Sequence, residues 1–101
     1  MNPKFSLDFI SDWRHGWLIV TEEHLALLYF LPSDFSEYSF FRSGDDGTAF
    51  ALEEDDDARL FIERAVEHGI MLDVTDIEVE GYSPIWACQD GWTRMSSLEV
   101  Q

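Results

Sequence analysis

Residues 50–69, FALEEDDDARLFIERAVEHG, are the most strongly patterned segment of the chain, because five consecutive acids run directly into an amphipathic stretch. The apolar positions recur at the spacing of one helical face: Ala58, Phe61, Ile62, Ala65 and Val66. Gly69 follows where a left-handed C-cap belongs, and Asp55 or Asp56 can cap the first turn. The pattern predicts a helix. It also raises the question of whether all five acids serve that helix.

Two hairpins and a strand are predicted around this helix. Aromatic or β-branched runs flank the Gly-rich acidic connection at residues 43–47 and indicate a β-hairpin. After the helix, GIMLDVTDIEVEGYS alternates apolar and acidic residues, which predicts a half-buried strand with Ile77 and Val79 on one face and a row of carboxylates on the other. The Asp-Gly step at residues 90–91 lies between two apolar or aromatic runs and predicts a second hairpin.

The N-terminal third gives a weaker pattern. HGWLIV suits a buried strand, and Thr21 can cap a helix over residues 22–31 that Pro32 stops, although the continuously apolar LALLYFL leaves a strand open. No repeat or low-complexity linker divides the chain, so residues 1–101 are predicted to form a single small domain. The predicted fold class is α+β, an antiparallel β-sheet packed with one or two α-helices on one face.

Negative charge is the dominant feature of the composition. The net charge is −15, from 21 Asp and Glu against six Lys and Arg, and residues 43–80 hold thirteen acids and two arginines, a net −11. Nucleic acid and anionic membranes are therefore not expected as partners. Like-charge repulsion of this size costs stability, so the excess indicates solubility, salt adaptation or recognition. Its concentration in one segment favours a recognition surface.

Cysteine content and apolar patterning predict the compartment. A single cysteine, Cys88, excludes an internal disulfide framework and suits a reducing cytosol. The N-terminus has no long apolar core behind a basic start, and no run approaches the length of a membrane-spanning helix. We therefore expect a cytoplasmic protein.

No residue pattern predicts catalysis or metal binding. His15, His24 and His68 have no Cys or His partner at metal-ligand spacing, and the Asp-Asp-Gly at residues 45–47 lacks the oxygen-ligand pattern of an EF-hand loop. Cys88 lies in a predicted strand, without a nearby base that would activate its thiol. The chain also has no phosphate-binding loop and no nucleophile elbow. We expect no enzymatic activity, no cofactor and no metal site.

The acids beyond those that a helix cap needs form the predicted partner-binding surface. One or two carboxylates suffice for a cap, so other members of residues 53–57 are surplus to folding. Asp76, Glu78 and Glu80 repeat at about 6.8 Å along a strand, a spacing comparable with successive phosphates of a nucleic-acid strand. Trp92 is the tryptophan most expected to anchor an interface, although core packing is the commoner role for each tryptophan. The complete predicted set is Asp45, Asp46, Glu53, Glu54, Asp55, Asp56, Asp57, Glu63, Glu67, Asp76, Glu78, Glu80 and Trp92.

A small, very acidic, lysine-poor domain without catalytic residues resembles the phage-encoded inhibitors that mimic nucleic acid, including anti-CRISPR and anti-restriction proteins. Residues 47–58, GTAFALEEDDDA, are similar to a stretch in one acidic anti-CRISPR group. The match covers only these residues and assigns no family site. The resemblance implies a partner such as the basic DNA channel or PAM-reading surface of a CRISPR effector, blocked competitively.

Three functions remain open at this point. The first is an acidic inhibitor that binds the basic surface of a nucleic-acid-binding protein, such as a CRISPR effector subunit or a restriction enzyme. The second is an immunity or antitoxin-like protein that neutralises one toxin, for which exposed aromatic anchors are expected to dominate binding. The third is a soluble domain whose acidity reflects adaptation to salt.

Overall fold

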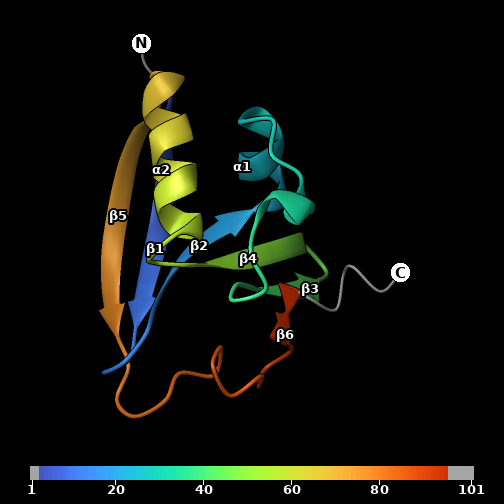
Figure 1. Ribbon diagram of the computed structural model, residues 1–101, viewed down its shortest axis with the longest axis vertical. Coiled ribbons are helices and arrows are strands. Elements are labelled where there is room, and N and C mark those ends of the chain that lie inside the picture. Colours follow the sequence, from blue (N-terminus) through green and yellow to red (C-terminus); the bar gives the residue numbers. More distant parts are fainter. Residues whose placement is uncertain (1–2, 96–101) are drawn as a thin grey trace.

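The structure, a computed structural model, describes residues 3–95, which form one six-stranded sheet with two α-helices (Figure 1). The elements in chain order are β1 (Lys4–Ser11), β2 (Gly16–Thr21), α1 (Glu22–Leu27), the 3₁₀ turn η1 (Pro32–Asp34), β3 (Phe40–Gly44), β4 (Gly47–Glu53), α2 (Asp57–Glu67), β5 (Met71–Glu78) and β6 (Thr93–Arg94). The strand order is β5-β1-β2-β4-β3-β6. The α+β class is confirmed at this level, but the sheet is mixed, because β5 runs parallel to β1 while the other pairs are antiparallel.

Both helices cover one face of the sheet. Alternate residues of β1, β2 and β4 point toward them, as the two-residue period of a strand requires: Phe5, Leu7, Leu18, Val20, Phe50 and Leu52. Helix α2 packs Ala58, Phe61 and Ala65 into this core, as predicted. Two further positions of the predicted apolar stripe, Ile62 and Val66, are instead 39% and 67% exposed. The guanidinium of Arg64 donates to the Leu28 carbonyl, so Arg64 is on the flank of α2 toward α1. At 100° per residue Ile62 and Val66 fall on the opposite flank, which is the one toward β5, the outermost strand (Figure 1).

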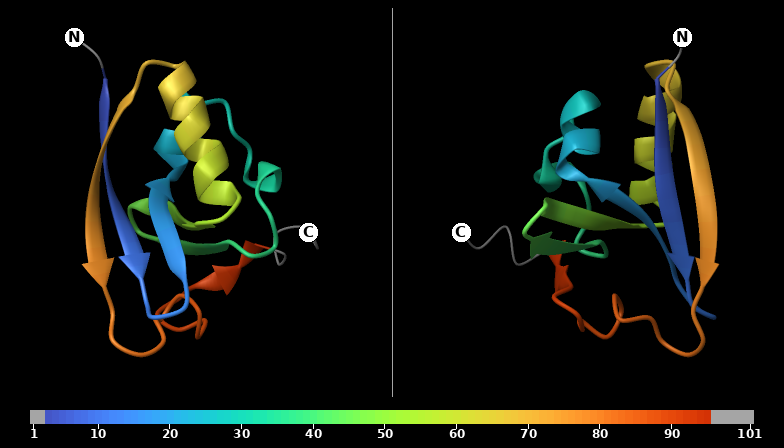
Figure 2. Two further views of the ribbon diagram at one scale, coloured as in Figure 1. Left: turned by 60° about the vertical axis from the view of Figure 1, so that its left-hand side comes forward. Right: turned by 180° about the vertical axis from the view of Figure 1, so that it is seen from behind.

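The opposite face of the sheet has a core of its own. Trp17, Phe40 and Ala51 are buried there together with Ile85 and Trp92, which come from the segment after β5. Figure 2 shows this segment running beneath the sheet before it returns as β6. Strand β2 is therefore covered on both faces, which explains why residues 17–20, WLIV, are continuously apolar.

Helix α1 is shorter than the predicted span of residues 22–31. It begins as expected, because the Thr21 hydroxyl accepts from the backbone N–H of His24, while Nδ1 of His24 accepts from the backbone N–H of Thr21. It ends at Leu27, and Tyr29 adopts a left-handed conformation with φ 60°. The chain therefore leaves the helix before Pro32, which begins η1.

The hairpin predicted around residues 90–91 is wrong, whereas the one around residues 43–47 is confirmed by the pairing of β3 with β4. Residues 84–91 form consecutive turns closed by local hydrogen bonds, among them Gln89 N–H to the Pro84 carbonyl at 2.8 Å. The strand that follows, β6, pairs with β3 and not with the preceding segment. Cys88 accordingly lies in a turn and is exposed, not buried in a strand. Within residues 3–95 no helix combines the length and apolarity needed to cross a membrane.

Candidate functional site

Asp57 is a structural acid. Its side chain is buried at the first residue of α2 and accepts hydrogen bonds from the Ser36 amide at 2.9 Å, from the Ser36 hydroxyl at 2.7 Å and from the Ser39 hydroxyl. The Ser39 hydroxyl oxygen in turn accepts from the backbone N–H of Glu53 at 3.0 Å. This network ties the start of α2 to the chain before β3 and to the end of β4. Asp57 is therefore not available to a partner, contrary to its place in the predicted surface.

Glu53 supports the turn into α2. Its carboxylate accepts from the backbone N–H groups of Asp55 at 3.0 Å and Asp56 at 3.2 Å, so it binds amides that would otherwise be free at the helix start. Burial raises the pKa of Glu53, and the Asp55 carboxylate raises it further, against the opposing effect of these two hydrogen bonds. Asp56 is the N-cap residue, as the sequence allowed, but its own side chain makes no capping bond.

Three of the five consecutive acids remain exposed: Glu54, Asp55 and Asp56. Asp56 has one ionic neighbour, Arg59, at 3.7 Å, and both side chains are well exposed, so the pair contributes little to stability. The Glu54 amide donates to the Gly16 carbonyl, and its carboxylate reaches back over Gly16, 2.9 Å from where a Cβ would stand. A Cβ there would also lie 2.5 Å from the ring of Phe9, so glycine at position 16 makes room for both side chains.

Strand β5 brings two more acids to the same end of the sheet. Asp76 is the register partner of Phe9, and Glu78 is the partner of Ser11, which itself pairs with Gly16. Asp76 therefore lies on the strand beside Phe9, and both the Phe9 ring and the Glu54 carboxylate lie close to Gly16. Both acids of β5 are exposed, because the last residues of this strand extend beyond the first turn of α2 (Figure 1). We call the exposed residues Glu54, Asp55, Asp56, Asp76 and Glu78 the acidic end.

The strand that carries these acids differs from the prediction in three ways. Nearly all of its residues are exposed, because β5 has a neighbour on one side alone, whereas a half-buried strand was expected. The carboxylates of Asp76 and Glu78 lie on the helix-bearing side, since they share the alternation of Leu72, which packs in that core. Glu80 follows the end of β5, so the predicted row of three carboxylates is reduced to two.

The other members of the predicted surface lie apart from the acidic end. Asp45 and Asp46 form the turn at the opposite end of β4, and Glu63 and Glu67 are exposed along α2. Trp92 is only 5% exposed and lies in one core cluster with Trp17, so it does not present the exposed ring that its predicted role as an interface anchor requires. It is buried because the segment after β5 is folded against the second face of the sheet.

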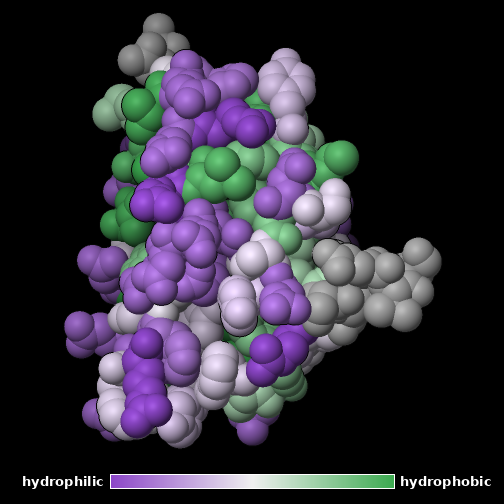
Figure 3. Space-filling model, viewed as in Figure 1, coloured by the Kyte–Doolittle hydropathy of each residue, from purple (hydrophilic) through white to green (hydrophobic). Residues whose placement is uncertain are grey.

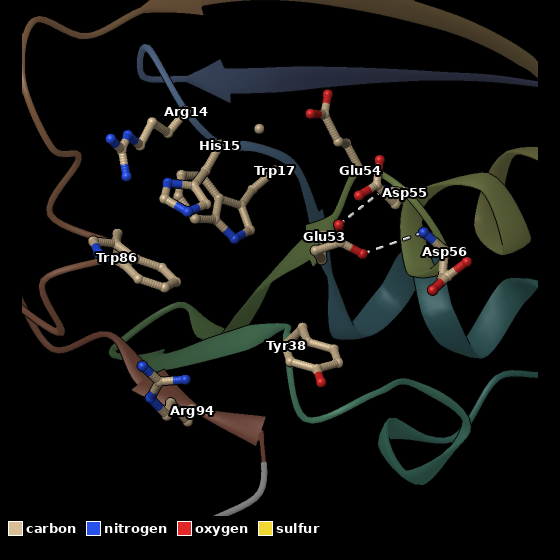
Figure 4. Close-up of a pocket in the computed structure, with 11 residues that line it drawn as sticks. Arg14, His15, Trp17, Tyr38, Glu53, Glu54, Asp55, Asp56, Trp86 and Arg94 are labelled. Carbon is tan, nitrogen blue, oxygen red and sulfur yellow. Dashed lines mark hydrogen bonds between the residues drawn. The ribbon is translucent and has the colours of Figure 1, made fainter.

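A cleft of about 420 Å³ opens beside the acids of residues 53–56 (Figure 4). On the side opposite these acids, the ring of His15 stacks on Trp86 at a centroid distance of 4.1 Å, with Trp17 behind it at 5.5 Å. Arg14 and Arg94 also lie on that side, and Tyr38 lies between the two walls. One wall is thus aromatic and cationic, and the other is anionic.

Asp12 holds the aromatic wall in place and was not predicted from the sequence. Its fully buried carboxylate accepts from the amides of Arg14 at 2.9 Å, His15 at 2.6 Å and Ser83 at 3.0 Å. Burial would raise the pKa of Asp12, but these hydrogen bonds and the nearby His15 ring outweigh it and lower the pKa. The bond to Ser83 joins the β1–β2 turn to a residue 71 positions away, so no local sequence signal could reveal it.

Further exposed aromatic residues lie near Arg14, which lines the cleft and has its guanidinium over the Trp13 ring. Trp13 is 64% exposed and lies 6.0 Å from the ring of Tyr82, which is also exposed. These residues, together with Tyr38 and the partly exposed Trp86, are the aromatic side chains that a partner can reach in this region. Sequence position alone did not distinguish them from the buried Trp17 and Trp92.

Among the described residues that line the cleft there is no Ser, Thr, Cys or Lys beside His15. Residues 3–95 contain no group of three His, Cys, Asp or Glu side chains arranged to hold a metal ion. Comparison of the chain with protein-family models, with curated proteins and with solved structures gave no significant match.

Proposed function

We propose that this protein is an acidic inhibitor that occupies the basic nucleic-acid-binding surface of a target protein, in the manner of DNA-mimicking anti-CRISPR or anti-restriction proteins. The observation that carries the proposal is the acidic end itself. Its five carboxylates are exposed and come from two separate segments. In the described part of the chain none of them accepts a hydrogen bond, whereas Glu53 accepts two. Within residues 3–95, the one cation bound to any of them is Arg59.

Folding does not account for these five acids. The buried Asp57 and the amide-binding Glu53 already organise the start of α2. The acidic end therefore adds repulsion that the single exposed pair of Asp56 with Arg59 offsets only weakly. A surface that resembles part of a phosphate backbone in charge gains by meeting Lys and Arg side chains, which are placed in nucleic-acid-binding proteins to contact phosphates. Electrostatic attraction between the acidic end and a basic surface also accelerates association and makes it dependent on salt.

The cleft supports the same function. A guanidinium or ammonium group that enters it is repelled by Arg14 and Arg94 and attracted to Glu54, Asp55 and Asp56 on the other wall. The exposed ring of Tyr38 lies between the walls and offers a cation–π contact to the same group. A basic side chain of the target would therefore be drawn to the acidic wall.

The test is affinity capture from host lysate at low salt and at about 0.5 M salt, with and without competing DNA. Wild-type protein should capture a nucleic-acid-binding protein that is released by salt and by DNA. The variant Glu54→Lys/Asp56→Lys should lose this capture. Asp45→Lys/Asp46→Lys is the matched control, because it makes the same change of charge at the far end of β4 and should retain capture. Equal loss in both variants would contradict a role for the acidic end.

A second candidate is an immunity-like protein that neutralises one toxin. The observation that favours it is the exposed Trp13–Tyr82 pair next to Arg14, since exposed aromatic residues are typical anchors of such interfaces. In that case Trp13→Ala should weaken capture far more than Glu54→Lys/Asp56→Lys, and DNA should not compete.

A further inference from the structure

Strand β5 has a free edge. It stands last in the strand order and pairs with β1 over all eight residues, in an uninterrupted parallel register. The amides of Met71 and Val79 donate to the carbonyls of Pro3 and Ser11. Because the backbone N–H groups of a strand point alternately to its two sides, those of residues 72, 74, 76 and 78 point away from β1. Among residues 3–95 no other strand meets them.

The free edge carries apolar as well as acidic side chains. Val74 is 40% exposed, and Ile62 and Val66 are exposed on the flank of α2 opposite Arg64, whose guanidinium reaches the Leu28 carbonyl after α1. Apolar residues gather between α2 and β5 in Figure 3, beside the hydrophilic surface of α2. Proteins usually protect such an edge with proline, lysine, a bulge or a short strand, and β5 has none of these. Its protection is the negative charge of three residues: Asp73, Asp76 and Glu78.

That charge determines which strand can pair with the edge. A second copy of this protein would place three more carboxylates beside those of β5, and like charges across paired strands are destabilising. A strand that carries Lys or Arg is instead stabilised by the pairing, because each basic side chain lies beside an acid of β5. Such a pair of opposite charges already exists between β1 and β5, where Nζ of Lys4 lies 3.9 Å from the Asp73 carboxylate.

We propose that β5 binds an extended, basic segment of the target protein by strand addition, so that the target continues the sheet beyond β5. The proposal rests on the proposed function for the basic nature of the target, and it names how the target is recognised. The side chains that face α2 define the required pattern. Apolar residues of the added strand lie beside Leu72 and Val74 and cover Ile62, while Lys or Arg lie beside Asp76 and Glu78.

The probe is a pair of synthetic peptides written for this pattern, TVTITKTR for a parallel and RTKTITVT for an antiparallel strand. Two controls accompany them. TVTITETE reverses the charge, and a copy of each basic peptide with N-methylated amides keeps the side chains but cannot donate backbone hydrogen bonds. Binding is followed by amide chemical shifts and by hydrogen exchange of the full chain, with the protection of the Val74, Asp76 and Glu78 amides as the specific readout.

Val74→Pro is the decisive protein variant. The Val74 amide points to the free edge, so proline there removes no bond to β1, and proline is tolerated on an edge strand in this orientation. Val74→Thr keeps the amide and is its control. If Val74→Pro lowers the melting temperature enough to compromise folding, Asp76→Lys/Glu78→Lys replaces it, since both side chains are exposed.

The expected result is that one basic peptide binds with a Kd below about 1 mM and protects the amides of Val74, Asp76 and Glu78. Val74→Pro and N-methylation should each weaken binding by about tenfold or more, since a ladder hydrogen bond is lost and the strands are held apart. Absence of binding, or binding that survives both changes, would overturn strand addition. If Val74→Pro still captures a DNA-competed target from lysate, strand addition fails while the proposed function stands.

Discussion

Substitution of Asp57 by alanine tests whether the five consecutive acids divide into structural and exposed members. The change leaves three donors without their acceptor: the Ser36 amide, the Ser36 hydroxyl and the Ser39 hydroxyl. Hydrogen bonds to a charged group contribute about 1.5–3 kcal/mol each, but water can reach Ser36 after the substitution, so the losses are not additive. We expect the free energy of unfolding to fall by about 3 kcal/mol in total, near the upper end of single-site effects.

The assay is thermal and urea-induced unfolding followed by circular dichroism. For a domain of this size a loss of 3 kcal/mol corresponds to a fall in melting temperature of roughly 12–24 °C. Asp55→Ala is the matched control, because it removes a neighbouring acid whose side chain is exposed, and it should change stability by no more than about 0.5 kcal/mol. Similar effects of the two substitutions would refute the division of this acidic run.

Three further predictions concern other parts of the structure. The pKa of the buried Asp12 is lowered in the folded protein, so its contribution to the free energy of unfolding is complete above the unfolded pKa of 3.8 and is lost as the pH falls through the lower folded pKa. In acid titrations below about pH 4, the stability of Asp12→Asn should therefore depend less on pH than that of the wild type. The tryptophan fluorescence should also change, because residue 83 loses its hydrogen bond. Burial lowers the pKa of His24 below 6.5, so stability should fall as pH drops through about 6.5, and His24→Gln should lose part of that dependence in urea titrations. Gly16→Ala should cost about 1–3 kcal/mol, measured by urea unfolding, because its Cβ would overlap the Phe9 ring and the Glu54 carboxylate; an unchanged midpoint would contradict that packing.

Local patterns in the sequence predicted the local elements. The spacing of Ala58, Phe61 and Ala65, with Gly69 at φ 72°, identified α2, and the Gly-rich connection identified the β3–β4 hairpin. Strand β1 has the alternation of Phe5, Leu7 and Phe9, a signal from which it could have been predicted. The exposure of Ile62 could not be predicted, because it depends on α2 lying over the edge of the sheet.

Long-range contacts account for most of the remaining differences. Burial of Trp92 depends on the return of the chain beneath the sheet to pair with β3, and the role of Asp57 depends on Ser36 and Ser39, about twenty positions away. The sequence therefore identified the acidic region as a whole. The structure separates its members into buried Asp57, amide-binding Glu53 and the exposed acidic end, a distinction that neighbouring residues do not encode.

The most direct test of the central claim is a displacement measurement with the captured target. Labelled DNA is bound to the target, and its fluorescence anisotropy is followed as this protein is added. A competitive inhibitor should release the DNA, saturating DNA should restore binding, and Glu54→Lys/Asp56→Lys should fail where Asp45→Lys/Asp46→Lys succeeds. DNA that stays bound while this protein also binds the target would contradict occupation of the nucleic-acid surface.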